Sequence, residues 1–166
     1  PALEVYKRYL GDMARDLPAS ALRFPLSVRG DKDDERSVVR TVLSIDERRQ
    51  SMTFAGDVPQ GSLVRLMQAS FDRLLDGAAQ AGQDAALAWN GGEALCLVVS
   101  CVGRRLVLGE RVEEELESVA DKLPAGSRSI GFYSYGELSP LVDGQCGLHN
   151  QTMTLTLLVE NVAPAL

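Results

Sequence analysis

The densest group of chemically capable side chains lies near the end of the chain, in two short stretches. The first, GFYSYGELSP (131–140), carries three aromatic rings and the carboxylate of Glu137. The second, GLHNQTMTLT (147–156), carries His149, the single histidine of the sequence, and Asn150. Such groups can bind a small polar molecule, with Glu137 facing an ammonium group and the rings covering its body.

Both stretches have the alternation of β-strands, and parity sorts their side chains between two faces. In the first, Ile130 and Phe132 share one face, whereas Tyr133, Tyr135 and Glu137 share the other. In the second, Met153, Leu155, Leu157 and Val159 alternate with the polar residues Asn150, Thr152, Thr154 and Thr156. If the strands pair as an antiparallel hairpin, the apolar sets coincide on the core side. The tyrosines, Glu137, Asn150 and the threonines then share a surface, with His149 at the hairpin mouth. The alternative is a solvated or helix-covered face, since tyrosine–threonine pairs stabilise a sheet unaided.

The three cysteines offer two other chemistries, and we predict neither. Cys96, Cys101, Cys146 and His149 could form a zinc site, but an odd offset aims Cys96 and Cys101 at opposite strand faces, so no metal site is expected. Cys101 could act as a nucleophile with His149 and Asn150, but nothing in the sequence brings them together. Neither GxxxxGK[ST] nor GxGxxG is present. We therefore expect a protein that is not an enzyme and has no cofactor.

Composition excludes several classes of function. The chain has 166 residues, is 45% hydrophobic and carries a net charge of −6, which fits one globular domain. An acidic protein is unsuited to nucleic acid or anionic membrane surfaces, because both require a basic field. The apolar runs are too short to span a bilayer. Because the chain begins at Pro1 rather than Met, we interpret it as a domain excised from a longer protein. An odd number of cysteines favours reduced thiols and a cytoplasmic location.

Periodicity predicts an α+β domain with a largely antiparallel sheet packed by helices, in the order α-β-β-β-β-α-β-α-β-β. The expected inward face of the strand at 37–46 is Val39, Thr41, Leu43 and Ile45. The strand at 93–103 reads as buried on both faces, since its apolar run does not alternate. Helices are expected within 2–17, 69–82 and 111–124, and the remaining strands within 22–29, 48–61, 62–68, 129–138 and 150–160.

The closing stretches GFYSYGELSPL and CGLHNQTMTLTLL resemble the C-terminal domain of the FIST family. YKRYLG, VVRTVLSID, MTFAGDVPQG and VSCVGRRLVLGER resemble it too, in the same order, so the resemblance spans almost the whole chain. It implies an intracellular sensory domain that binds a small ligand such as an amino acid. Its implied partners are an N-terminal FIST domain and a signalling output module.

The candidate ligand-binding residues rest on these motifs. They are Tyr133, Tyr135, Glu137, His149 and Asn150, with Arg40 of VVRT and Arg104 of CVGRR as partners for an anion. The alternative function is a protein-interaction scaffold in which the tyrosine face binds another protein, since tyrosine is favoured at interfaces.

Overall fold

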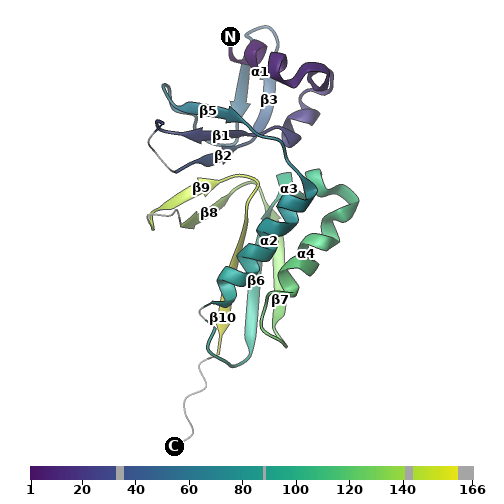
Figure 1. The fold of residues 1–166 in the computed structure, drawn as a ribbon, viewed down its shortest axis with the longest axis vertical. Coiled ribbons are helices and arrows are strands. Elements are labelled where there is room, and N and C mark those ends of the chain that lie inside the picture. The colour runs from purple at the N-terminus through teal and green to yellow at the C-terminus, as the bar shows by residue number, and fades with distance from the viewer. Residues whose placement is uncertain (33–35, 88, 141–143, 161–166) are drawn as a thin grey trace, which may run out of the picture.

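The structure, a computed structural model, describes residues 1–32, 36–87, 89–140 and 144–160. Figure 1 shows two lobes, one above the other, with the chain crossing between them before the long helix α2. Helices and short sheets mix in both lobes, which confirms the predicted α+β class. All but one of the described strand pairings are antiparallel, and the strands form several small sheets rather than one.

The N-terminal lobe packs helical turns against two small sheets. Its core includes Leu3, Tyr6 and Leu10 from the apolar face of the first helix. The sheets are ordered β2-β1-β5 and β3-β4. The elements are α1 (Ala2–Leu10), the 3₁₀ turns η1 (Gly11–Asp16) and η2 (Ala19–Arg23), β1 (Leu26–Arg29), β2 (Val38–Arg40), β3 (Val42–Asp46), β4 (Ser51–Phe54) and β5 (Leu63–Leu66).

The C-terminal lobe is a three-stranded sheet, ordered β10-β6-β7, with helices on one side of it and a two-stranded hairpin beyond its end. The strands β6 and β7 run parallel, joined by a helical crossover, and β10 runs antiparallel to β6. The elements are α2 (Phe71–Ala86), β6 (Ala94–Cys101), α3 (Val102–Leu108), η3 (Gly109–Arg111), α4 (Val112–Ala120), β7 (Arg128–Ser134), β8 (Glu137–Pro140), β9 (Cys146–His149) and β10 (Met153–Val159).

The strand predicted at 37–46 is broken at Thr41, and its predicted inward face is correct only in part: Thr41 is buried and Ile45 packs against the core, whereas Val38 packs there in place of Val39. The backbone N–H of Thr41 bonds the side chain of Asn150 rather than a neighbouring strand, at 3.2 Å. The ladder of β3 with β4 also shifts register between Val42 and Ser44. As a result Val42 is 2% exposed and packs in the core, whereas Leu43 is 56% exposed.

The predicted hairpin between 129–138 and 150–160 is also wrong for most of its length. The strand β6 lies between β7 and β10 and pairs with both along their full length. Only beyond Cys101, where β6 ends, do the two chain segments meet, as the hairpin of β8 and β9. A sequence pattern fixes which residues share a strand face but not which strand is the neighbour.

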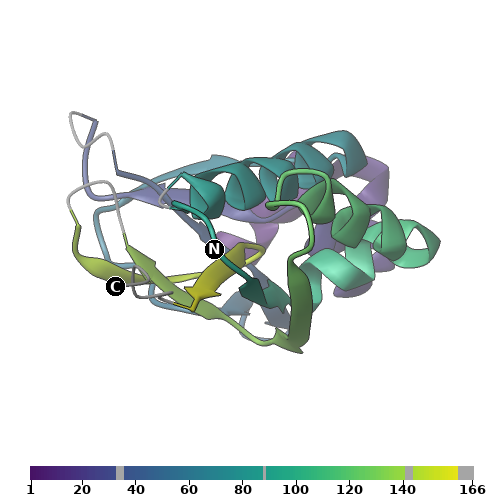
Figure 2. The ribbon, with the colours of Figure 1, turned by 90° about the horizontal axis from the view of Figure 1, so that it is seen from below.

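The core side of β7 is the opposite of the predicted one. Ile130 is 62% and Phe132 is 59% exposed, because they lie on a sheet face that the helices leave open. The teal and green helices in Figure 2 lie on one side of the sheet. Tyr133 lies on that helix-covered side, in register with the buried Ser100. The open face also corrects the prediction that the strand 93–103 is buried on both faces, since its Leu95 is 41% exposed.

Helix boundaries differ in smaller ways. The first helix ends at Leu10, because Gly11 adopts a φ of 57° and the chain continues as a 3₁₀ turn. The second continues past Gly82, which is buried against α4: a Cβ there would lie 3.1 Å from the Val119 carbonyl oxygen. Helix α3, in GRRLVLG, was not predicted, since seven residues carry little periodicity.

Gly131 holds β7 close to β6, and its replacement tests this pairing. A Cβ at Gly131 would lie 2.2 Å from the Val98 carbonyl oxygen, so Gly131→Ala forces the strands apart. We expect a loss of at least about 2 kcal/mol in unfolding free energy, measured by urea denaturation.

The control is Gly77→Ala within α2, where a Cβ would have only Arg104 Nη1 near it, at 3.9 Å. Alanine is the better helix former, so this variant should be neutral or gain up to about 1 kcal/mol. Equal stability of Gly131→Ala and the wild type would contradict the close approach of β7 and β6.

Candidate functional site

The two lobes meet at a junction where one buried side chain joins them. Asn150, which is 1% exposed, follows β9, and its Oδ1 accepts from the Thr41 N–H at 3.2 Å. Its Nδ2 donates to the carbonyl oxygens of Ala55, at 3.3 Å, and His149, at 3.1 Å. The carboxamide therefore supplies the hydrogen bonds that strand pairing would otherwise give to Thr41, where the strand of the N-terminal lobe is interrupted.

Arg40 makes a second tie from the opposite direction. This residue ends β2 and is 8% exposed, and its Nη1 donates to the Leu148 carbonyl oxygen of β9 at 3.0 Å. Its Nε donates to the Asp57 carbonyl oxygen at 2.9 Å, and its side chain packs on Gly56. Burial lowers the pKa of Arg40, and the nearby Asp57 carboxylate opposes that effect.

Gln151 makes a third tie, which the sequence reasoning missed. It adopts a φ of 54°, and its Nε2 donates to the Leu22 carbonyl oxygen of η2 at 2.8 Å. Its own carbonyl oxygen accepts from Arg104 Nη1 at 3.4 Å. The polar run HNQT (149–152) between two apolar segments was the signal that could have identified Gln151. Strand parity placed Asn150 and Thr152 on one face, but it says nothing about a residue in the turn between two strands.

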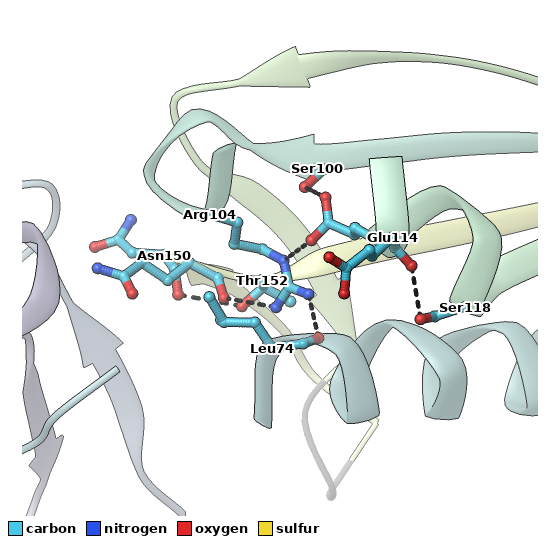
Figure 3. Close-up of polar contacts among 9 residues, drawn as sticks. Leu74, Ser100, Arg104, Glu114, Ser118, Asn150 and Thr152 are labelled. Carbon is cyan, nitrogen blue, oxygen red and sulfur yellow. Dashed lines mark hydrogen bonds and ion pairs between the residues drawn. The ribbon is translucent and has the colours of Figure 1, made fainter. Parts of the chain in front are cut away.

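Arg104 lies in a buried ion pair beside this turn (Figure 3). Its Nε donates to Glu115 Oε1 at 2.6 Å, and the two side chains are 5% and 0% exposed. Its Nη2 donates to the Leu74 carbonyl oxygen at 2.6 Å, and Ser100 donates to Glu115 Oε2 at 3.1 Å. Arg104 thus joins β6, α2 and α4 to the junction. Removal of either charge would leave the other buried and unpaired, which is strongly destabilising.

Glu137 and His149 face each other across the hairpin of β8 and β9. Glu137 is 3% exposed and its Oε1 accepts from the Ser134 hydroxyl. Among the described residues, Glu137 Oε2 and His149 Nε2 are buried atoms with no hydrogen-bond partner, as is Thr41 Oγ1. Burial raises the pKa of Glu137, and the hydrogen bond from the Ser134 hydroxyl only partly offsets this increase.

Cys101 lies beside Glu137 at the end of β6. Burial raises the pKa of its thiol, with the Glu137 carboxylate adding to the effect and the backbone N–H groups of Gly103 and Gln151 opposing it. A raised pKa disfavours the thiolate that a nucleophile needs. Of the other two cysteines, Cys96 is buried in the core and Cys146 is exposed.

The two tyrosines differ in their exposure to solvent. Tyr133 is half-buried on the helix side, and the Arg105 guanidinium lies 5.1 Å from its ring centroid. Tyr135, between β7 and β8, is 85% exposed. Of the seven predicted residues, the structure gathers Arg40, Asn150, Glu137 and His149 at or beside the junction. Arg104 contacts it through Gln151, and the tyrosines lie outside.

A hollow of about 440 Å³ opens beside Arg40 in the N-terminal lobe. Its lining includes Arg29, Arg40 and Asp57, together with the turn at 59–62. The volume is in the range of small-ligand sites, and the lining offers both signs of charge. Arg29, which ends β1, and Asp57, which follows β4, were not among the predicted site residues.

Comparison with known protein families identifies the family of this chain. A family model described as the FIST C domain matches residues 2–140. The chain belongs to the FIST C domain family. No curated protein and no solved structure shows significant similarity to it. The match confirms the resemblance seen in the sequence, and it covers α1 through β8, including Arg40, Arg104 and Glu137.

FIST C domains are sensory domains associated with signal transduction. In the described part of the chain, no three His, Cys, Asp or Glu side chains gather in a way that could hold a metal ion. None of the helices in the described ranges is long and apolar enough to cross a membrane.

The buried carboxyl of this FIST C domain gives a pH-dependent prediction. The folded state holds the Glu137 proton more tightly than the unfolded state, whose pKa is near the ordinary 4.5. The contribution of Glu137 to the free energy of unfolding should therefore fall as pH rises from about 4.5 through the higher folded pKa, and then stay level. We expect Glu137→Gln to raise the melting temperature by a few degrees at pH 7 and to leave it unchanged at pH 4.

Thermal unfolding followed by circular dichroism from pH 4 to pH 8 measures this difference. The matched control is Glu110→Gln, an exposed glutamate, which should shift neither end of the profile. If Glu137→Gln instead lowers the melting temperature at pH 7, the folded protein stabilises the charged carboxylate, and the prediction is wrong.

Proposed function

We propose that this FIST C domain senses a small zwitterionic ligand of the amino-acid type and transmits binding through the contact between its lobes. The observation that carries the proposal is the position of Arg40, which lines the hollow and also bonds the Leu148 carbonyl oxygen of the other lobe. One side chain is thus shared between a candidate binding site and the lobe junction.

The charges of the hollow suit the two ends of an amino acid. A ligand carboxylate can accept hydrogen bonds from the guanidinium of Arg40 or Arg29, because arginine offers several donors in a planar fork. The Asp57 carboxylate in the same lining can accept from a ligand ammonium group. The apolar neighbours Val28 and Val38 leave room for a short side chain.

Ligand binding would act on the junction by competition. A carboxylate that draws Arg40 into the hollow weakens its bond to Leu148, and the lobes then share fewer polar ties. A ligand shifts a conformational equilibrium only through different affinities for the two states, and this exchange of partners supplies such a difference. A partner domain in contact with both lobes, such as an N-terminal FIST domain or a signalling output module, would receive the change. In this role the domain is cytoplasmic and not an enzyme.

Isothermal titration calorimetry against the twenty amino acids, up to about 10 mM ligand, tests the proposal. We expect one or a few amino acids to bind, and we expect Asp57→Asn to weaken binding at least about tenfold, since the charge-assisted hydrogen bond to the ligand ammonium group is lost. Asp57 is exposed, so its replacement should leave the fold intact.

Asp12→Asn is the control, since Asp12 is 82% exposed on η1, far in sequence from the hollow. It should bind as the wild type does. An absence of heat with the whole panel would overturn the ligand proposal, and undiminished binding by Asp57→Asn would move the ligand away from the hollow.

A second candidate function, a protein-interaction scaffold, is favoured by the open sheet face. Four apolar side chains lie exposed on it, which is a larger apolar area than scattered surface residues present. They are Leu95, Ile130, Phe132 and Leu158. The tyrosine face first considered for this role is divided, because Tyr133 is half-buried under Arg105 and only Tyr135 is fully available.

A further inference from the structure

The outer edge of β7 is an unprotected edge strand. In the order β10-β6-β7, β7 pairs only with β6, and no other described strand continues the sheet beyond it. Natural edges are commonly blocked by proline, bulges or several charges. The seven residues of β7, RSIGFYS, contain no proline and a single charge, that of Arg128.

Apolar side chains lie exposed on both sides of this edge. On the open face of the sheet, Ile130 and Phe132 are 62% and 59% exposed. On the helix side, Leu116 of α4 is 51% exposed and lines a hollow of about 340 Å³ together with Gly131 of β7. Small residues on the inner side of β7, Ser129 and Gly131, leave this hollow unfilled. The side chains of an additional strand along β7 would pack beside these apolar groups on both faces of the sheet.

We propose that the occupant of this edge is a second copy of the chain, whose β7 pairs antiparallel about a two-fold axis through Gly131. Such pairing joins the two three-stranded sheets into one of about six strands. The proposal concerns a surface of the C-terminal lobe and does not rest on the ligand site.

The sequence of β7 is self-complementary in this register. Gly131 is the middle residue of the strand, so each Ile130 lies opposite Phe132 of the other copy. Pairs of aromatic and β-branched residues are among the favourable cross-strand contacts. Ser129 lies opposite Tyr133, and Arg128 lies opposite Ser134, so no like charges face each other along the strand.

Charge around the edge predicts an unusual salt dependence. Each copy carries a net charge of −6, and α4 contributes Glu113 and Glu117 next to Leu116. Two copies therefore repel each other at long range, and salt screens that repulsion. The dimer should become tighter as salt increases, whereas an interface built on opposite charges would weaken.

The proposed contact between the two copies is small, so we expect a weak dimer. A seven-residue strand is about 23 Å long, and a sheet with one helix layer is about 15 Å deep, so each copy buries roughly 350 Å². This is the size of weak, reversible interfaces, for which dissociation constants of about 10–100 µM are reasonable.

Sedimentation velocity of the 166-residue chain from about 5 to 500 µM measures the equilibrium. We expect a reversible dimer and at least about tenfold weaker association of Ile130→Lys, which replaces both apolar cross-strand pairs with Phe132 and brings two further like charges to the contact. A wild-type chain that stays monomeric at every concentration would overturn the proposal, and a different protein would then be the remaining candidate partner for this edge.

The control Leu158→Lys separates edge pairing from face-to-face packing. Leu158 is 54% exposed on the same open face, but it lies on β10, at the opposite edge of the sheet. Edge pairing predicts that Leu158→Lys dimerises within about twofold of the wild type. If both variants lose association equally, the copies pack through the sheet face and the edge proposal is wrong.

Amide hydrogen exchange provides a readout independent of both substitutions. Exchange at residues 128–134 should slow as the wild-type concentration rises, whereas β10 should be unaffected. A tighter dimer at about 500 mM than at about 50 mM salt would support the apolar self-association, and a weaker one would contradict it.

Discussion

The arrangement of the two lobes depends on the carboxamide of Asn150. This side chain is 1% exposed and satisfies two backbone groups of the other lobe, the Thr41 N–H and the Ala55 carbonyl oxygen. Thr41 lies where the strand pairing of the N-terminal lobe is interrupted, so its N–H would otherwise be buried without a partner. A lost partner for a buried backbone group costs about 1–3 kcal/mol, which is enough to set the position of one lobe against the other.

The remaining contacts at the junction have a common form. Arg40 and Gln151 also reach across to backbone carbonyl oxygens, those of Leu148 and Leu22. Polar side chains bound to carbonyl oxygens can be exchanged for ligand or water, unlike interdigitated apolar side chains in a core. An apolar cluster of Leu74, Val107 and Leu108, with Leu22 against it, keeps the lobes together beside them. This combination of exchangeable polar ties and a small apolar contact is suited to a domain that must respond to binding.

Much of the local structure could be predicted from the sequence, because periodicity reports on the environment of each strand and helix. The parity of Met153, Leu155 and Leu157 places them on the core side of β10, and the stripe of Leu3, Tyr6 and Leu10 packs as expected. The family itself was also identifiable from motifs at both ends of the matched region. These features depend on residues close together in the chain.

The errors arose where distant segments decide the outcome. Parity could not show that β6 separates β7 from β10, so Ile130 and Phe132 were assigned to the core although they lie on the open face. The break at Thr41 depends on Asn150, more than a hundred residues later in the chain. Asn150 itself was among the predicted site residues for its chemistry, but its bonds in the structure are those of a tie between lobes.

Hydrogen exchange of Asn150→Ala, read by mass spectrometry beside the wild type, tests the role of this carboxamide most directly. We expect faster exchange at Thr41 and in the adjacent strands β3 and β4, while β6 and β10 keep their protection, because the variant separates the lobes without unfolding the C-terminal sheet. Unchanged exchange at Thr41, or an equal loss of protection throughout both lobes, would contradict the claim that Asn150 sets the contact between them.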